Sequence, residues 1–239
     1  DPNGGGTIQI LQVTTKDELP GLITGNTRYV VPGSGGGSGN IADPFLGLQA
    51  AADAAQAGDV FSIAQGNYSP FSINIGGTAA SPIVFSGSNT DTVIIDGENI
   101  STGIVTLGVW NDSISNIVIE NMVIQNGAWG IDAQNSQYIT VRNCIIRDVD
   151  FGFYNRRANG WEHDQTLSDN VFIGRTAWPQ TGGIIPPERG INILGNNNVI
   201  RFNEVSFFGD GISTDASPYK ISYSLDIHNN RIHHVVDDL

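Results

Sequence analysis

Three stretches of the chain decide the fold: Ile117–Asn121 (IVIEN), Ile139–Asn143 (ITVRN) and Leu225–Asn229 (LDIHN). Each reads apolar, any residue, apolar, polar, Asn. Asn170 and Asn203 end two poorer copies, and the intervals between the five successive asparagines are 22, 27, 33 and 26 residues. A repeat of this length suits one coil of a solenoid whose loops vary. Since alternate residues are buried in a strand and stacked coils pair in parallel, we predict an all-β fold, a parallel β-helix, with these asparagines as structural residues at equivalent corners.

A second landmark recurs in step with the first. A glycine precedes an apolar residue at Gly130-Ile131, Gly152-Phe153, Gly190-Ile191 and Gly211-Ile212. If the apolar residue points inward, the next residue points outward. The residues expected to point outward are Asp132, Tyr154, Asn192 and Ser213, followed two positions later by Gln134, Arg156, Leu194 and Asp215. We expect a ligand of the solenoid to lie along this outer column.

Long loops lie beside this column, and such loops on a regular scaffold often carry binding residues. The segment 155–164 contains Arg156, Arg157, Trp161 and His163, and the segment 176–189 contains Trp178 and Arg189. Indole rings can stack on sugars, and guanidinium groups bind carboxylates or hydroxyls. The structural alternative is that the rings pack the loops onto the coil and the arginines pair with nearby acids.

The charge of the chain narrows the class of partner. The 239 residues include 24 acidic and 11 basic ones, a formal charge of −13. This surface repels phosphate backbones and anionic lipid headgroups, so we expect neither nucleic acid nor membrane as a partner. The sequence also lacks an apolar stretch of roughly 18 residues that could span a membrane. A polyanionic polysaccharide would need a local cationic patch or a bound metal ion, whereas a neutral one would not.

The chain divides into two expected parts. Residues 1–40 would form an N-terminal strand (7–13) and a Gly/Ser-rich loop, and residues 41–239 the β-helix, with regular coils from about Ile83. Asp43-Pro44 and the Ala-rich run before Gly58 predict a helix over 44–57 that caps the N-terminal end of the solenoid. Cys144, the one cysteine, lies in an apolar run and is expected to be a buried thiol.

A resemblance to a known family extends from Tyr29 to Asn229. Its motifs are YVVPGSG (29–35), DPF (43–45), AQAGDV (55–60), GNY (66–68), SPI (81–83) and VIIDG (93–97), followed by the Asn coils. With these motifs the chain resembles secreted right-handed β-helix proteins of the pectin-lyase-like superfamily. The resemblance implies right-handed coils, secretion and a polysaccharide partner. It does not select a reaction, because the superfamily includes lyases, glycoside hydrolases, epimerases, tailspikes and adhesins.

A group of carboxylates is predicted near the C-terminus. Phe208–Ile212 (FGDGI) aligns, one coil later, with Val236–Leu239 (VDDL), which puts Asp210 about one strand spacing from Asp237 and Asp238. Like charges this close raise one pKa or gather a cation, as a general acid and base require. The pattern resembles that of polygalacturonase-type glycoside hydrolases, which implies Asp210 and Asp237 or Asp238 as acid and base. The alternative is a solvated turn or a Ca²⁺ site.

Two departures from the hydrolase pattern keep other functions open, and the first is the long interval between the Asp210 motif and Asp237-Asp238. The second is that the chain stops at Leu239, before the His and Arg-x-Lys elements that such hydrolases carry on later coils. A lyase would need a base beside a charge-neutralising group, for which Lys220, Tyr219, Arg156, Arg157 and His163 are candidates. Adjacent histidines on a strand face opposite ways, so His233 and His234 are not expected to share a metal ion.

The repeat breaks off in mid-strand at Leu239, so either the native chain continues or a second copy covers the end. The second option favours a non-catalytic structural or adhesive solenoid that stacks end to end. We rank a secreted polysaccharide-active protein first, with hydrolysis ahead of β-elimination, and substrate bound by Asp132, Tyr154, Arg156, Arg157, Trp161, His163, Trp178, Asn192, Asp215 and Lys220.

Overall fold

The computed structural model describes residues 25–108, 112–134, 136–156, 163–175, 188–214 and 224–236. The strands are β1 (Asn26–Val31), β2 (Phe45–Leu46), β3 (Asp59–Ile63), β4 (Gly66–Tyr68), β5 (Phe71–Ile73), β6 (Ile83–Gly87), β7 (Val93–Leu107), β8 (Ile114–Glu120), β9 (Val123–Gln134), β10 (Ser136–Arg142), β11 (Ile145–Arg156), β12 (Thr166–Ser168), β13 (Val171–Gly174), β14 (Arg189–Asn192), β15 (Val199–Arg201), β16 (Glu204–Ser206), β17 (Asp210–Ser213), β18 (Asp226–His228) and β19 (Arg231–His233). The described helix, α1, spans Leu48–Asp53.

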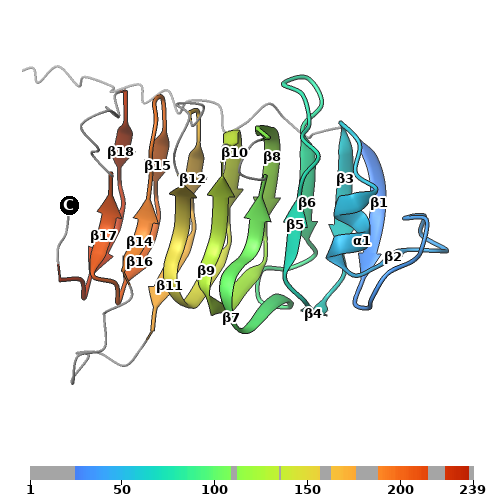
Figure 1. The fold of residues 1–239 in the computed structure, drawn as a ribbon, viewed down its shortest axis with the longest axis horizontal. Coiled ribbons are helices and arrows are strands. Elements are labelled where there is room, and N and C mark those ends of the chain that lie inside the picture. The colour runs from blue at the N-terminus through green and yellow to red at the C-terminus, as the bar shows by residue number, and fades with distance from the viewer. Residues whose placement is uncertain are drawn as a thin grey trace, which may run out of the picture.

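The strands form two sheets whose named strand pairs are all parallel. The first sheet has the order β18-β15-β12-β10-β8-β6-β3-β1-β2 and the second β19-β16-β13-β11-β9-β7-β4, with β14 and β17 extending from β11 and β5 beside β7. Each strand thus lies beside its equivalent in the next coil, and the coils follow one another along the long axis of the molecule (Figure 1). The predicted all-β parallel β-helix is confirmed, while its right-handedness stays a prediction.

The core lies between the sheets and consists of inward-facing columns. One column of the first sheet runs in register through Phe61, Phe85, Ile119, Val141, Leu167 and Ile200, all of them fully buried. Phe61 and Phe85 stack with their ring centroids 4.8 Å apart. Burying a side chain of this size contributes about 1.5–3 kcal/mol, so these columns are a large part of what holds the coils together.

The predicted asparagine column is in fact two neighbouring columns. Glu120, Arg142, Ser168, Arg201 and His228 pair in register, so the next residue along each coil is Asn121, Asn143, Asp169, Phe202 and Asn229. All five have a left-handed φ, between 50° and 60°. Assigning Asn170 and Asn203 to this column was therefore wrong by one residue. The corner needs a left-handed backbone, which Asn adopts readily, but Asp169 and Phe202 occupy it in those two coils.

Asn170, Asn203 and Asn230 instead form a ladder one position later, level with Cys144. The Cys144 N–H donates to Oδ1 of Asn170 (3.0 Å), the Asn170 N–H to Oδ1 of Asn203 (3.1 Å), and the Asn203 N–H to Oδ1 of Asn230 (3.0 Å). Each amide Nδ2 in turn donates to a backbone carbonyl of the preceding coil, that of Val141, Leu167 or Ile200. The ladder satisfies backbone groups at the bend and joins each coil to the next.

The glycine of the second landmark has a packing role. Gly130, Gly152 and Gly190 lie above one another, and a Cβ built on Gly152 would meet the Gly190 carbonyl oxygen at 2.3 Å and a Phe172 ring atom at 2.6 Å. No larger residue fits without displacing backbone. The apolar partners pair as predicted, because Phe153 lies opposite both Ile131 and Ile191, and Ile191 opposite Ile212.

The N-terminal region differs from the expectation in two ways. The sheet already includes β1, which pairs with β3, so parallel pairing starts before the expected boundary at residue 41 and the expected onset of coils at Ile83. The helix predicted over 44–57 is shorter, because Phe45-Leu46 pair with Val30-Val31 as β2, and the Asp43 carboxylate accepts the Ser38 N–H (3.0 Å) instead of capping a helix. That α1 caps the solenoid stays a prediction, and the predicted strand 7–13 lies outside the described residues.

Two further expectations concern single features. Cys144 is buried, at 1% exposed, and burial raises its pKa from 9.0 to about 12. The buried thiol is confirmed. In the part of the chain that the structure describes, no helix is long and apolar enough to cross a membrane.

Candidate functional site

Two register columns lie on the outer side of β9, β11, β14 and β17. The first immediately precedes the landmark glycine and consists of Trp129, Phe151, Arg189 and Asp210. The second immediately follows the landmark apolar residue and consists of Asp132, Tyr154, Asn192 and Ser213. We call these eight residues the strip. The register of the second column is the predicted one.

The accessibility of that second column differs from the prediction. Asp132 and Asn192 are buried, at 2% and 0% exposed, whereas Tyr154 and Ser213 are partly exposed. Neither Asp132 nor Asn192 is without a partner. Strand alternation gives the direction of a side chain but not what covers it, so the residues predicted to point outward differ in exposure. That Asp132, Tyr154 and Asn192 bind substrate stays a prediction.

Three aromatic rings form a cluster on the strip. The Trp129 and Tyr154 rings are nearly parallel, at 14° with centroids 6.3 Å apart, and the Phe151 ring lies 4.5 Å from that of Tyr154. Trp129 and Phe151 are 6.5 Å apart. All three side chains are only partly buried. Rings that pack on one another and still face outward form a preorganised apolar surface for a flat ligand.

Charge follows the aromatic cluster in the same column. Arg189 lies in register with Phe151 on one side and Asp210 on the other. Its Nε is 3.4 Å from Oδ2 of Asp210, and the two side chains are 26% and 38% exposed. The strip thus holds a cation, Arg189, of the kind that an anionic polysaccharide would need on this acidic chain. This cation is paired with Asp210. Pairs this exposed contribute little to stability, so the guanidinium can exchange partners at small cost.

The predicted carboxylate cluster is described only at Asp210. The last described residue, Val236, donates its N–H to the Gly209 carbonyl (2.9 Å), so the described chain ends close to Asp210. Several predicted site residues lie outside the described residues: Asp237, Asp238, Arg157, Trp161, Trp178, Asp215 and Lys220. Arg156 belongs to β11, but its side chain is likewise outside the description. The acid and base roles stay predictions.

The described residues contain no group of three or more His, Cys, Asp or Glu arranged to hold a metal ion. The expectation that His233 and His234 face opposite ways is nevertheless wrong. β19 ends at His233 and His234 has a left-handed φ of 55°, so their Nδ1 atoms lie 2.6 Å apart. Nε2 of His233 lies 2.8 Å from Oε1 of Glu204. The strand rule fails here because the second histidine has already left the strand.

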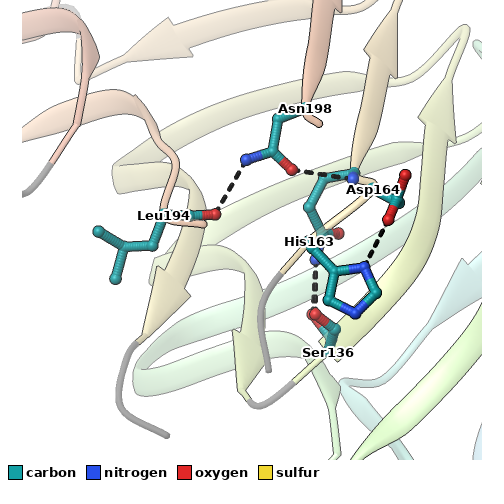
Figure 2. Close-up of polar contacts among 6 residues, drawn as sticks. Ser136, His163, Asp164, Leu194 and Asn198 are labelled. Atoms are coloured by element: carbon teal, nitrogen blue, oxygen red, sulfur yellow. Dashed lines mark hydrogen bonds and ion pairs between the residues drawn. The ribbon is translucent and has the colours of Figure 1, made fainter. Parts of the chain in front are cut away.

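His163 does not lie on the strip. It forms isolated parallel bridges with Gln137 and Asn196, in line with the first sheet. Its Nδ1 is 2.5 Å from Oδ2 of Asp164 (Figure 2). The His163 ring meets the Tyr138 ring edge-on, with centroids 5.2 Å apart. The prediction that grouped His163 with the outer column is corrected, since the chain turns from the second sheet to the first between Arg156 and this residue.

Sequence reasoning missed Trp129 and Phe151. The signal was present in the second landmark, because the residue before each glycine also recurs on one face: Trp129, Phe151, Arg189 and Asp210. Only the residue after the apolar position had been followed. The same column also explains why Asp210 meets Arg189, which lies one coil earlier.

Among known proteins, one relative matches this chain over part of its length. No family model matches the chain. A pectate lyase, PEL9 of Emericella nidulans, is 32% identical over 134 residues, which is 48% of this chain and 33% of that protein's length. Among solved structures, pectate lyase Pel9A is 14% identical with a TM-score of 0.44, covering 90% of this chain and 79% of that one. An alginate lyase from Paenibacillus sp. is also 14% identical, with a TM-score of 0.42, covering 79% of this chain and 95% of that one.

Proposed function

We propose that this chain binds an acidic polysaccharide along the strip and cleaves it by β-elimination, outside the cell. The observation that carries the proposal is the strip itself, where three half-buried rings pack on one another and one of them, Phe151, lies in register with Arg189. Aromatic faces pack against the C–H faces of sugar rings, and a guanidinium binds a carboxylate through two hydrogen bonds. The pectate lyase relative supports a uronate substrate.

Elimination fits these groups better than hydrolysis. In elimination a base removes the proton from the carbon beside the uronate carboxylate, and negative charge develops on that carboxylate. The electrons of the broken C–H bond then form the double bond to C4, while the 4-oxygen leaves with its bond electrons and takes up a proton from water. Arg189 is the described strip residue that would neutralise this charge as it develops. Hydrolysis by Asp210 with Asp237 or Asp238 is the alternative, in which Asp210 would serve as acid or base beside its partner Arg189. For the base of elimination we retain Lys220, Tyr219, Arg156 and Arg157.

A Ca²⁺ requirement belongs to the same proposal. Calcium takes carboxylate oxygens as ligands, and it would offset the acidity shared by chain and substrate. Asp132 and Asp210, the carboxylates of the strip, lie three strand spacings apart and Asp132 is buried, so they would not share one ion, and carboxylates of the substrate would have to supply ligands. The activity assay is therefore run with added Ca²⁺ and with EDTA.

The deciding experiment incubates the purified chain with polygalacturonate and scores reducing ends together with far-ultraviolet absorbance of the unsaturated product. Both signals rising together support elimination. Reducing ends without absorbance support hydrolysis, and the lyase proposal is then dropped. If neither signal appears on polygalacturonate, alginate or rhamnogalacturonan, light scattering over a concentration series tests the end-to-end solenoid instead.

A further inference from the structure

A second candidate site lies on the first sheet, where strands β10, β12, β15 and β18 begin. A pocket of about 470 Å³ opens there. The lining side chains that matter for its chemistry are Tyr138, Asp164, Thr166, Asn197, Ser224 and Asp226. This volume is in the range of pockets that hold small ligands. None of these residues belongs to the strip.

Tyr138 is an unusually bulky residue for its backbone conformation. It occupies a left-handed corner column whose other members are Asn116, Asp164, Asn197 and Ser224, with φ between 53° and 59° throughout. Short polar residues tolerate this conformation, whereas a bulky one is strained there by about 1–2 kcal/mol. Burial does not offset that strain, because the tyrosine is 49% exposed. Phe202 shares this conformation and exposure at another corner, so what distinguishes Tyr138 is that it also lines the pocket.

The polar groups beside Tyr138 are held in place. His163 fixes the Asp164 carboxylate through its Nδ1, as Figure 2 shows. Beneath them the buried Asn198 amide accepts the Gln165 N–H (2.9 Å) and donates to the Leu194 carbonyl (3.0 Å). The Gln165 side chain donates to the Ser136 carbonyl at 2.7 Å. The pocket floor is therefore preorganised, as a binding site requires.

The charges of the pocket select an uncharged ligand. Asp164 and Asp226 contribute carboxylates, Thr166 and Ser224 hydroxyls, and the described lining includes neither Lys nor Arg. A uronate would be repelled by this set. A neutral sugar fits it, because carboxylates accept hydrogen bonds from sugar hydroxyls and the tyrosine ring can cover the apolar face of the sugar. We propose that this pocket binds an uncharged sugar unit, at a site that acts independently of the strip and of the reaction proposed above.

The test is isothermal titration with neutral tetrasaccharides, namely galactotetraose, arabinotetraose, xylotetraose and cellotetraose, and with tetragalacturonate and CaCl₂ as competing probes. We expect at least one neutral probe to bind with a Kd of about 1 mM or tighter. Tyr138→Asn should weaken that binding at least about tenfold. This variant should remain folded, because Asn suits the left-handed corner.

Phe202→Asn is the matched control. Phe202 also has a left-handed φ, 56°, is 46% exposed, and meets a histidine, His228, edge-on with centroids 5.6 Å apart, yet it does not line the pocket. This variant and Trp129→Ala on the strip should bind the neutral probe as the parent does. The proposal is overturned if no neutral probe binds, if Tyr138→Asn and Phe202→Asn behave alike, or if Tyr138→Asn alters binding of tetragalacturonate or Ca²⁺ instead.

Discussion

The Arg189 guanidinium and the Asp210 carboxylate meet across adjacent coils, with Nε 3.4 Å from Oδ2. Arg189 is the cation proposed for elimination, and Asp210 is the carboxylate that hydrolysis would use. Substituting the two residues separately therefore distinguishes the two reactions more sharply than either product assay alone.

Asp210→Asn tests the acid. Under elimination this change removes only an exposed ion pair of Arg189, and we expect kcat/KM on polygalacturonate to stay within about threefold of the parent value. Under hydrolysis the loss of a general acid or base would lower kcat by about 10²–10⁴-fold. Steady-state kinetics on the folded variant decide the matter, and a loss of the larger size would end the elimination proposal.

Arg189→Ala tests the cation of the strip. Removing a hydrogen-bonding partner of a charged group costs about 1.5–3 kcal/mol, so kcat/KM should fall by about 10- to 100-fold. Arg231→Ala is the control, because Arg231 is 73% exposed and pairs with Glu204 away from the strip. Equal losses in the two variants would show a general charge effect and remove Arg189 from the site.

Asn203→Ala tests the amide ladder. The change leaves the Asn170 N–H and the Leu167 carbonyl without their partners in a buried setting. Each orphaned group costs about 1–3 kcal/mol, so the free energy of unfolding should fall by about 2–6 kcal/mol. Urea unfolding measures it. Asn229→Gly, at an exposed corner with φ 55°, should change the value by less than about 0.5 kcal/mol.

The raised pKa of the Cys144 thiol predicts that the folded chain loses stability at alkaline pH. This pKa is raised from 9.0 to about 12, so the folded chain keeps the proton longer than the unfolded chain does. The contribution is complete below pH 9 and is lost as the pH rises toward 12, by about 1.4 kcal/mol per pH unit. Urea unfolding of the parent and Cys144→Ala should therefore converge between pH 9 and pH 10. The raised pKa of Tyr68 is common to both chains, and parallel curves would contradict the assignment.

The coil architecture could be predicted from the sequence because two landmarks repeat in step. The corner residues could not be aligned to the residue, since an Asn suits both the left-handed corner and the buried ladder. Asn229 and Asn230 stand side by side, one in each column, and nothing in their identity separates them. Only the hydrogen bonds of the neighbouring coil do so.

The register of the candidate site was predicted from the sequence, but the burial of its residues and part of its membership were not. Alternation placed Asp132 and Tyr154 in one column, because the period of a strand is fixed. It could not reveal that Asp132 is buried, nor that His163 lies in line with the other sheet, since neither follows from the period of a strand. Trp129 was accessible to the same reasoning, had the residue before the glycine been followed as well.

The amide ladder makes each coil an interchangeable module. Asn170, Asn203 and Asn230 each bond only to the coils adjoining them, and the residues between successive rungs differ in number without disturbing the ladder. A whole rung can therefore be duplicated or excised while its neighbours find the same partners, whereas a single-residue deletion within a rung would turn every following side chain to the wrong face. The length of this molecule is thus open to change in whole coils, and with it the length of any polymer it can lie along.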